Sequence, residues 1–217
     1  MADTQLITLN NARSAAAEAY RTLRTNLMFS SVERPLNTLA VTSPVEAEDK
    51  STVLANLAVT FAQGGYKTII VDSDLRRPMQ HTIWGVKNER GLTTMMLEDA
   101  ALSNPPLLQT SVENLLLLPS GTLPPNPADI LGSQRMNDII GLLKARANYV
   151  LFDVPPVLAA TDAALLGAKL DGVLLVLCAG HTRRDHTGRA KQALERVHVR
   201  IVGSVLTNAP RENMGKY

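Results

Sequence analysis

Short apolar runs alternate with amphipathic segments along most of this chain. Apolar runs of four to eight residues are typical of buried strands, and apolar residues recurring every three to four positions indicate helices. Predicted strands cover 38–41, 68–72, 115–118, 149–153, 172–178 and 201–207, and predicted helices cover 14–29, 51–63, 127–146, 162–169 and 184–197. Strands that are apolar throughout are typical of a mostly parallel sheet with helices on both faces, so we predict an α/β fold of that kind.

The first predicted helix lies ahead of this alternating pattern, and Pro35 separates it from the first strand. The stretch 102–127 holds six of the twelve prolines, and we interpret it as a surface excursion rather than a domain boundary. We find no internal repeat. The sequence therefore predicts one domain over 1–217, with an N-terminal helix in 1–30, a core in 31–210 and a tail in 211–217.

Composition narrows the classes of function. Apolar residues make up 45% of the 217 residues, which is enough to bury a core. A net charge of +2 and 4% aromatic residues favour neither a basic face nor a base-stacking platform, so we expect no nucleic-acid partner. No apolar stretch approaches the roughly 20 residues of a membrane helix. The start lacks the pattern of a signal peptide, and the single Cys178, expected to be buried, has no disulfide partner, so we predict a cytoplasmic chain.

The segment between the first strand and the next helix has the layout of a phosphate-binding loop. Lys50 and Ser51 open the helix after the loop 44–49. In such loops backbone N–H groups cradle phosphates, the lysine reaches the β- and γ-phosphates, and the hydroxyl holds Mg²⁺. Here Ala47 and Asp49 stand where glycines are expected. Taken alone, the motif is equally compatible with an ordinary capped helix.

Aspartates follow two of the other predicted strands. Asp72 and Asp74 lie at the end of 68–72 and just past it, and Asp153 ends 149–153. Such carboxylates can hold Mg²⁺ and its water or accept a hydroxyl proton, although single strand-end aspartates also commonly cap turns. Because ligands bind beyond the carboxyl ends of parallel strands, the three pieces together favour a catalytic site.

Three motifs of this chain resemble motifs in the cytoplasmic domain of the bacterial tyrosine kinases (BY-kinases). The run 72–78, Asp-Ser-Asp-Leu-Arg-Arg-Pro, resembles their second Walker motif, and 152–156, Phe-Asp-Val-Pro-Pro, resembles their Walker B motif. The run 18–24 is similar to their Glu-x-x-Arg-x-x-Arg motif. The resemblance covers the chain from about residue 12 onward. It implies a fold like that of P-loop NTPases and ATP-dependent autophosphorylation on tyrosine, in the regulation of polysaccharide synthesis and export.

The resemblance also implies roles for individual residues, with ATP and Mg²⁺ as cofactors and Asp72 as the base for the incoming tyrosine hydroxyl. The implied sets are Lys50, Asp72, Asp74 and Asp153 for catalysis; Asp49, Lys50, Ser51, Thr52 and Asn208 for the nucleotide, with the Asn208 alignment open by one position toward Thr207; Ser51, Asp74 and Asp153 for the metal; and Tyr217 as phosphoacceptor.

Partners are implied in the same way. Glu18, Arg21 and Arg24 would dock on a neighbouring subunit and build a homo-oligomeric ring. Read locally, the three side chains could equally form a solvated helix face with ion pairs worth a few tenths of a kcal/mol. The family also implies a membrane adaptor, fused or separate, which would hold the chain at the inner face of the cell membrane.

The phosphate-binding loop departs from the family pattern of glycines. A non-glycine residue in a glycine conformation costs roughly 1–3 kcal/mol. A carboxylate such as Asp49 at about 4 Å from a phosphate costs about 4 kcal/mol at an effective dielectric near 20, or about a thousandfold in affinity. Glu46 and Glu48 add negative charge. Our hypothesis from the sequence is therefore that the chain binds ATP poorly or not at all.

Two alternatives to an active kinase follow. One is a pseudo-kinase scaffold that no longer binds ATP well. The other is an ATPase of the partition or division-site type, which shares the fold. Partition and division-site ATPases carry a lysine early in the loop, where this chain has Val45, and those ATPases lack the motif that this chain has at 18–24. We therefore rank this alternative last.

Overall fold

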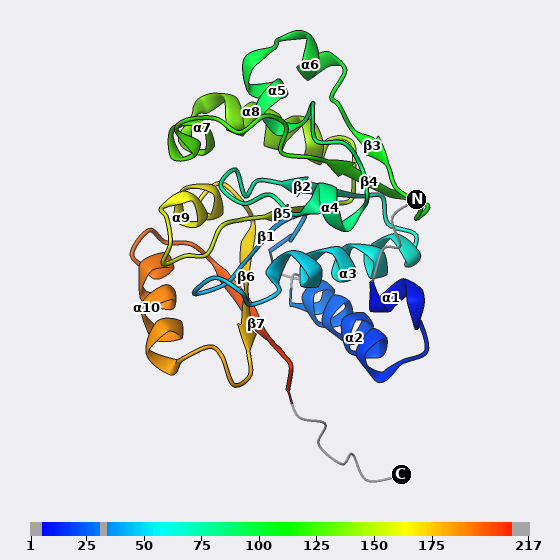
Figure 1. The fold of residues 1–217 in the computed structure, drawn as a ribbon, viewed down its shortest axis with the longest axis vertical. Coiled ribbons are helices and arrows are strands. Elements are labelled where there is room, and N and C mark those ends of the chain that lie inside the picture. The colour runs from blue at the N-terminus through cyan, green and yellow to red at the C-terminus, as the bar shows by residue number, and fades with distance from the viewer. Residues whose placement is uncertain (1–5, 31–33, 210–217) are drawn as a thin grey trace.

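A seven-stranded sheet forms the centre of the structure, a computed structural model that describes residues 6–30 and 34–209 (Figure 1). The strand order is β3-β4-β2-β5-β1-β6-β7, and only the edge pair β3–β4 is antiparallel among the described residues. The prediction of a mostly parallel sheet is confirmed. The strands are β1 (Thr38–Thr42), β2 (Thr68–Asp72), β3 (Leu108–Gln109), β4 (Leu115–Leu118), β5 (Tyr149–Asp153), β6 (Gly172–Cys178) and β7 (Ile201–Thr207).

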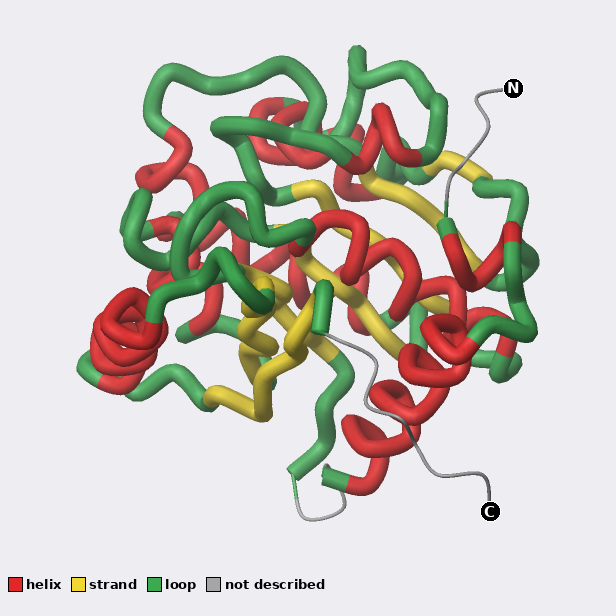
Figure 2. Tube along the Cα trace, turned by 60° about the horizontal axis from the view of Figure 1, so that its bottom comes forward, coloured by secondary structure: helices red, strands yellow, loops and turns green. Residues whose placement is uncertain are grey.

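Helices cover the sheet on both faces, as the two views in Figures 1 and 2 show. α1, α2 and α3 lie on one face, and α8, α9 and α10 lie on the other. The helices are α1 (Ile7–Asn10), α2 (Ala15–Phe29), α3 (Lys50–Gln63), α4 (Gln80–Ile83), α5 (Leu92–Leu97), α6 (Ala100–Ser103), α7 (Pro127–Gly132), α8 (Gln134–Lys144), α9 (Asp162–Gly167) and α10 (Arg184–Glu195).

The alternation of side chains along each strand explains why the strands are apolar throughout. In β5, Val150 and Phe152 belong to the apolar cluster that includes α8, whereas Leu151 belongs to the cluster built around α3. Successive side chains of a strand point to opposite faces, so a strand covered on both sides needs apolar residues at every position. This arrangement leaves the strand ends as the places where polar side chains can gather.

The predicted N-terminal helix is confirmed as α2. Ser14 caps it, its hydroxyl oxygen accepting from the backbone N–H of Ala17 at 3.1 Å. α2 packs on α3, which lies beside it in Figure 1, through buried residues such as Leu27.

Three predictions need correction. The helix predicted over 127–146 is two helices, because Ser133 is extended and its hydroxyl oxygen accepts from the backbone N–H of Met136 at 3.3 Å, which starts a new helix. The stretch 102–127 is not only a surface excursion, since it supplies β3 and the largely buried β4. Cys178 is half-buried rather than buried.

Candidate functional site

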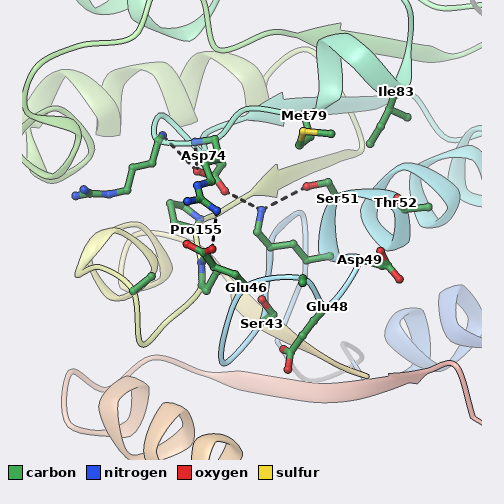
Figure 3. Close-up of a pocket in the computed structure, with 16 residues that line it drawn as sticks. Ser43, Glu46, Glu48, Asp49, Ser51, Thr52, Asp74, Met79, Ile83 and Pro155 are labelled. Carbon is green, nitrogen blue, oxygen red and sulfur yellow. Dashed lines mark hydrogen bonds and ion pairs between the residues drawn. The ribbon is translucent and has the colours of Figure 1, made fainter. Parts of the chain in front are cut away.

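A cavity of about 550 Å³ lies beyond the carboxyl ends of β1, β2 and β5, where α3 begins (Figure 3). The register of the parallel strands places Asp72 of β2 directly beside Asp153 of β5. Asp74 follows two residues after Asp72 and lines the cavity. The strand-end aspartates therefore come together, as the sequence pattern led us to expect.

Lys50 lines the cavity and contacts two of the aspartates. Its Nζ donates to Asp74 Oδ2 and to Asp153 Oδ1, both at 2.9 Å, and reaches Ser51 Oγ at 3.4 Å. Burial opposes the charge of Lys50, but the two carboxylates outweigh burial and raise its pKa above the usual value. The site is therefore built around a charged lysine held between two acids.

Asp72 is fully buried beside this ion cluster. Its Oδ2 accepts from the backbone N–H of Gln80 at 2.9 Å, and its Oδ1 has no hydrogen-bond partner among the described residues. Burial, and then the charge of Asp153, raise the pKa of Asp72 well above the usual value. A carboxylate with a raised pKa is a stronger proton acceptor once it is ionised.

Gln80, which no sequence pattern predicted as a site residue, connects these groups. Its side-chain Nε2 donates to Asp153 Oδ2 at 2.8 Å and to the carbonyl oxygen of Ser51 at 3.0 Å. Its Oε1 accepts from the indole N–H of Trp84 at 3.3 Å. A glutamine two residues after the Arg-Arg-Pro run carries no recognisable motif, and only its nearness to that run could have drawn attention to it.

The backbone of the loop 44–49 adopts glycine-like conformations without glycine. Ala47 has a φ of 61° and Asp49 a φ of 56°, both in the left-handed region. These are the two positions where the sequence pattern expects glycine. Left-handed backbone costs an alanine roughly 1–2 kcal/mol and an aspartate less. The loop therefore keeps its shape at the expense of some strain.

The three acids of this loop point in different directions (Figure 3). Glu46 pairs with Arg77, Oε2 to Nη1 at 2.5 Å. Glu48 is buried, and its carboxylate turns away from the cavity to accept from the hydroxyl of Thr182. Burial raises the pKa of Glu48, although the Thr182 bond partly offsets this. Both contacts tie the loop to other parts of the chain.

Asp49 is exposed, and its carboxylate points away from Asp74 (Figure 3). It acts instead on Tyr20 of α2, whose pKa is raised to about 12 by burial and then by the charge of Asp49. Because water screens an exposed charge, the estimate of about 4 kcal/mol made from the sequence is too large. At about 4 Å in water the cost is about 1 kcal/mol, or about fivefold in affinity.

A second ion pair, in which only the carboxylate is buried, supports the segment after β2. Asp162, fully buried at the start of α9, accepts from Arg76 Nε at 2.9 Å and Nη2 at 3.0 Å. The hydrogen bonds to Asp162 raise the pKa of Arg76. This fork-like pair fixes the Arg-Arg-Pro run relative to α9.

The 18–24 motif lies on α2, away from the cavity. Arg21 Nη1 pairs with Glu18 Oε2 at 2.7 Å, and Arg21 Nη2 donates to the carbonyl oxygen of Ala12 at 2.6 Å. Arg24 Nη1 donates to the carbonyl oxygen of Thr60 at 2.6 Å. Within one chain, both arginines are thus already engaged, while Glu18 remains exposed.

The other residues predicted for nucleotide binding and phosphorylation differ in where they lie relative to the cavity. Thr52 lines the cavity with Lys50 and Ser51. Asn208 follows β7 with a φ of 52° and is not among the cavity-lining residues of the described ranges. Tyr217 lies outside the described residues.

The donor set suits magnesium bound together with a nucleotide. The described residues contain no group of three or more His, Cys, Asp or Glu side chains placed to hold a metal alone. Mg²⁺ in nucleotide sites is usually held by one or two carboxylates together with substrate phosphates and water. Asp74, Asp153 and the Ser51 hydroxyl match that pattern of oxygen ligands.

Residues 6–30 and 34–209 include no helix long and apolar enough to cross a membrane.

Comparisons with known proteins agree with this geometry. No family model matches the chain. It is 38% identical to the tyrosine-protein kinase YwqD of Bacillus subtilis, over 98% of this chain and 89% of that protein. It is 34% identical to the putative tyrosine-protein kinase CapB of Staphylococcus aureus, over 94% of this chain and 90% of that protein.

Solved structures point the same way. The chimerical protein CapA2B2 matches with a TM-score of 0.90 and 33% identity, over 95% of this chain and 90% of that one. The kinase domain of the Escherichia coli tyrosine kinase ETK matches with a TM-score of 0.88 and 29% identity, over 98% and 83%. The cell division ATPase MinD of Pyrococcus furiosus, at 24% identity and a TM-score of 0.65, over 78% of this chain and 71% of that one, shares the fold. The chain therefore belongs to the family of bacterial tyrosine-protein kinases, the BY-kinases.

Proposed function

We propose that this chain is a protein-tyrosine kinase domain that transfers the γ-phosphoryl group of ATP to tyrosine, in the control of polysaccharide synthesis or export. The observation that supports this best is Lys50, held 2.9 Å from both Asp74 and Asp153 at the start of α3. A lysine at a helix N-terminus beside paired carboxylates suits a magnesium nucleotide, because phosphoryl transfer depends mainly on positioning and charge stabilisation.

Each residue then has a stated task. Lys50 and the backbone N–H groups at the start of α3 would bind the phosphates, and Ser51, Asp74 and Asp153 would hold Mg²⁺, which neutralises charge on the transferring group when it is bound. Asp72 would accept the proton of the attacking tyrosine hydroxyl. Its burial and raised pKa suit that role, since they favour proton uptake.

A second candidate, a scaffold that binds ATP poorly, is favoured by the loop. Ala47 and Asp49 hold left-handed backbone that glycine adopts without strain. However, Glu48 turns away from the cavity, Glu46 is paired with Arg77, and Asp49 is exposed. These orientations support weakened rather than abolished nucleotide binding. The likeness to MinD rests on the fold alone and supports no further candidate.

We also propose that the chain assembles through α2 and works at the inner face of the membrane with a membrane adaptor. Glu18 is 67% exposed and pairs only with Arg21 of its own helix among the described residues, so its carboxylate is accessible to a second copy. Arg21 and Arg24 would have to exchange their contacts to Ala12 and Thr60 for contacts with the neighbour. Exchange of one hydrogen bond for another costs little, so the present contacts are compatible with a docked state.

Transfer of radiolabelled phosphate from ATP to tyrosine tests the proposal. We expect slow labelling by the wild-type chain, faster labelling by Ala47→Gly/Asp49→Gly, and none by Asp153→Asn. A tyrosine-containing peptide serves as an added acceptor, so that the readout does not depend on the tail. Labelling by the repaired loop alone would favour the scaffold, and no labelling by either protein would overturn both the kinase proposal and the repair.

A further inference from the structure

Gln80 is the residue on which the pieces of the candidate site converge. It is fully buried in the first position of α4. Its side chain contacts the start of α3 through the carbonyl oxygen of Ser51 and the end of β5 through Asp153. Its backbone N–H contacts the end of β2 through Asp72. One residue thus joins the phosphate-binding helix to both aspartate strands.

The hydrogen bonds of the Gln80 amide form a complete set. A glutamine side chain offers two N–H donors and one carbonyl acceptor. The donors bond to Asp153 Oδ2 and the Ser51 carbonyl, and the acceptor takes the indole N–H of Trp84. A buried amide with every group partnered is held in one orientation. Because the Ser51 carbonyl and the Asp153 carboxylate can only accept, they fix which way the amide faces, Trp84 satisfies the remaining oxygen, and the amide in turn restrains Asp153.

The two oxygens of Asp153 are thereby divided between two tasks. Oδ2 accepts from Gln80, and Oδ1 accepts from Lys50 on the cavity side. Removing the Gln80 donor would free the carboxylate to rotate and would leave Oδ2 buried without a partner. A partner of this kind around a metal-binding carboxylate typically changes metal affinity by about 10–100-fold when it is removed.

We propose that Gln80 is a positioning residue that holds Asp153, relative to α3, in the orientation needed to bind Mg²⁺ with the nucleotide. This inference rests on the proposed function, because it assigns Asp153 to the metal. A purely structural role for Gln80 predicts something different. Loss of packing alone would weaken binding of nucleotide with and without Mg²⁺ to the same extent.

Titration with ADP, in excess EDTA and in saturating Mg²⁺, separates these roles. For Gln80→Met we expect the gain in affinity that Mg²⁺ gives to fall by about tenfold or more, while affinity in EDTA changes less than about twofold. Trp84→Phe is the matched control, since it changes the same cluster but leaves both donors of Gln80, and we expect less than a threefold change. A parallel fall under both conditions would overturn the proposal.

Trp84 allows a second test that needs no nucleotide. It is the single tryptophan of the chain, and its indole N–H reports on the Gln80 amide. Asp153→Asn should change Trp84 emission in a protein that contains Gln80 and leave it unchanged in the Gln80→Met background. If Asp153→Asn has no effect on emission with Gln80 present, the bridge does not exist in solution and the proposal is wrong. Gln80→Asn, whose amide is one methylene too short for both donations, replaces Gln80→Met if that variant fails to fold.

The two tests also separate this proposal from the kinase proposal. If the wild-type loop binds ADP too weakly, both titrations are made in Ala47→Gly/Asp49→Gly. Absence of ADP binding in both loops would overturn the kinase proposal and the metal role of Gln80, while the emission test would still decide whether Gln80 holds Asp153. Binding of ADP with a Mg²⁺ effect independent of Gln80 would overturn this inference alone.

Discussion

The two sides of the candidate site are built in different ways. On one side, behind the cavity lining, Asp72 and Asp153 are fully buried, and Asp153 accepts hydrogen bonds from two side chains on two other elements. On the other side the loop 44–49 has exposed side chains at Glu46, Ala47 and Asp49 and left-handed backbone at two residues. The carboxylate side is part of the core, whereas the phosphate side is a surface loop.

This difference explains why the surface loop tolerates substitutions more readily than the buried side of the site. Buried charges that lose a partner destabilise a fold strongly, so Asp74, Asp153 and Lys50 are constrained by folding as well as by chemistry. A surface loop can accept non-glycine residues at the expense of about 1–3 kcal/mol of strain. Intact Asp74 and Asp153 are therefore weaker evidence of activity than an intact loop, and experiments should separate the two sides.

The largest expected effect is on the carboxylate side. Lys50→Met leaves Asp74 and Asp153 without their shared cation, and breaking a buried ion pair typically costs about 3–5 kcal/mol. We expect a loss of that size in the free energy of unfolding at pH 7, measured by urea denaturation. Lys67→Met, at an exposed lysine, is the control and should stay within about 0.5 kcal/mol. A loss below about 1 kcal/mol for Lys50→Met would mean that the cluster contributes no more than a surface pair.

Two adjacent arginines give the next comparison. Arg76 pairs with the fully buried Asp162, and Arg77 pairs with the exposed Glu46 of the loop. We expect Arg76→Met to lower the free energy of unfolding by about 2 kcal/mol, because Asp162 remains buried while Arg76 itself is partly solvated. Arg77→Met should change it by less than about 1 kcal/mol. Equal effects would remove the distinction between a core side and a loop side.

The sequence predicted the core side better than the loop side, for physical reasons. Apolar periodicity located β1, β2, β5 and α3, and parallel strands necessarily bring Asp72 and Asp153 to one edge. Periodicity could not locate α4, a single turn, and therefore not Gln80, whose importance comes from contacts with residues distant in sequence. The loop sequence showed how many acids the loop contains but not where their side chains point. The burial of Glu48, for example, depends on its contact with Thr182, a residue distant in sequence that the loop sequence does not reveal.

Replacing Asp72 should raise the free energy of unfolding, whereas the replacements of Lys50 and Arg76 should lower it. Its pKa is raised in the folded chain, so the folded state binds the proton more tightly than the unfolded state. Its favourable contribution is complete below the unfolded pKa of about 3.9 and is lost as pH rises through the folded value. Ionised Asp72 therefore destabilises the fold at pH 7, and Asp72→Asn should stabilise it there by about 1 kcal/mol.

The pH dependence identifies the cause of that gain. Urea denaturation should show the advantage of Asp72→Asn at pH 7 and its disappearance near pH 4. Asp138→Asn, at an exposed position of α8, should show no comparable trend. A destabilised Asp72→Asn at neutral pH would mean that the carboxylate has a partner in solution that the buried Oδ1 lacks in this structure.

The smallest effect tests what the loop still does to a nucleotide. Asn tolerates left-handed backbone as well as Asp does, so Asp49→Asn removes charge while keeping the φ of 56°. Because the carboxylate is exposed, we expect only about a fivefold gain in affinity for Mg²⁺–ADP at low salt, shrinking toward none near 1 M salt, where the Debye length is about 3 Å. Ala47→Gly should also raise affinity, but without that salt dependence, because it relieves backbone strain alone. A gain from Asp49→Asn that persists at high salt would show that this carboxylate faces the phosphates closely, and the loop would then oppose nucleotide by charge rather than by strain.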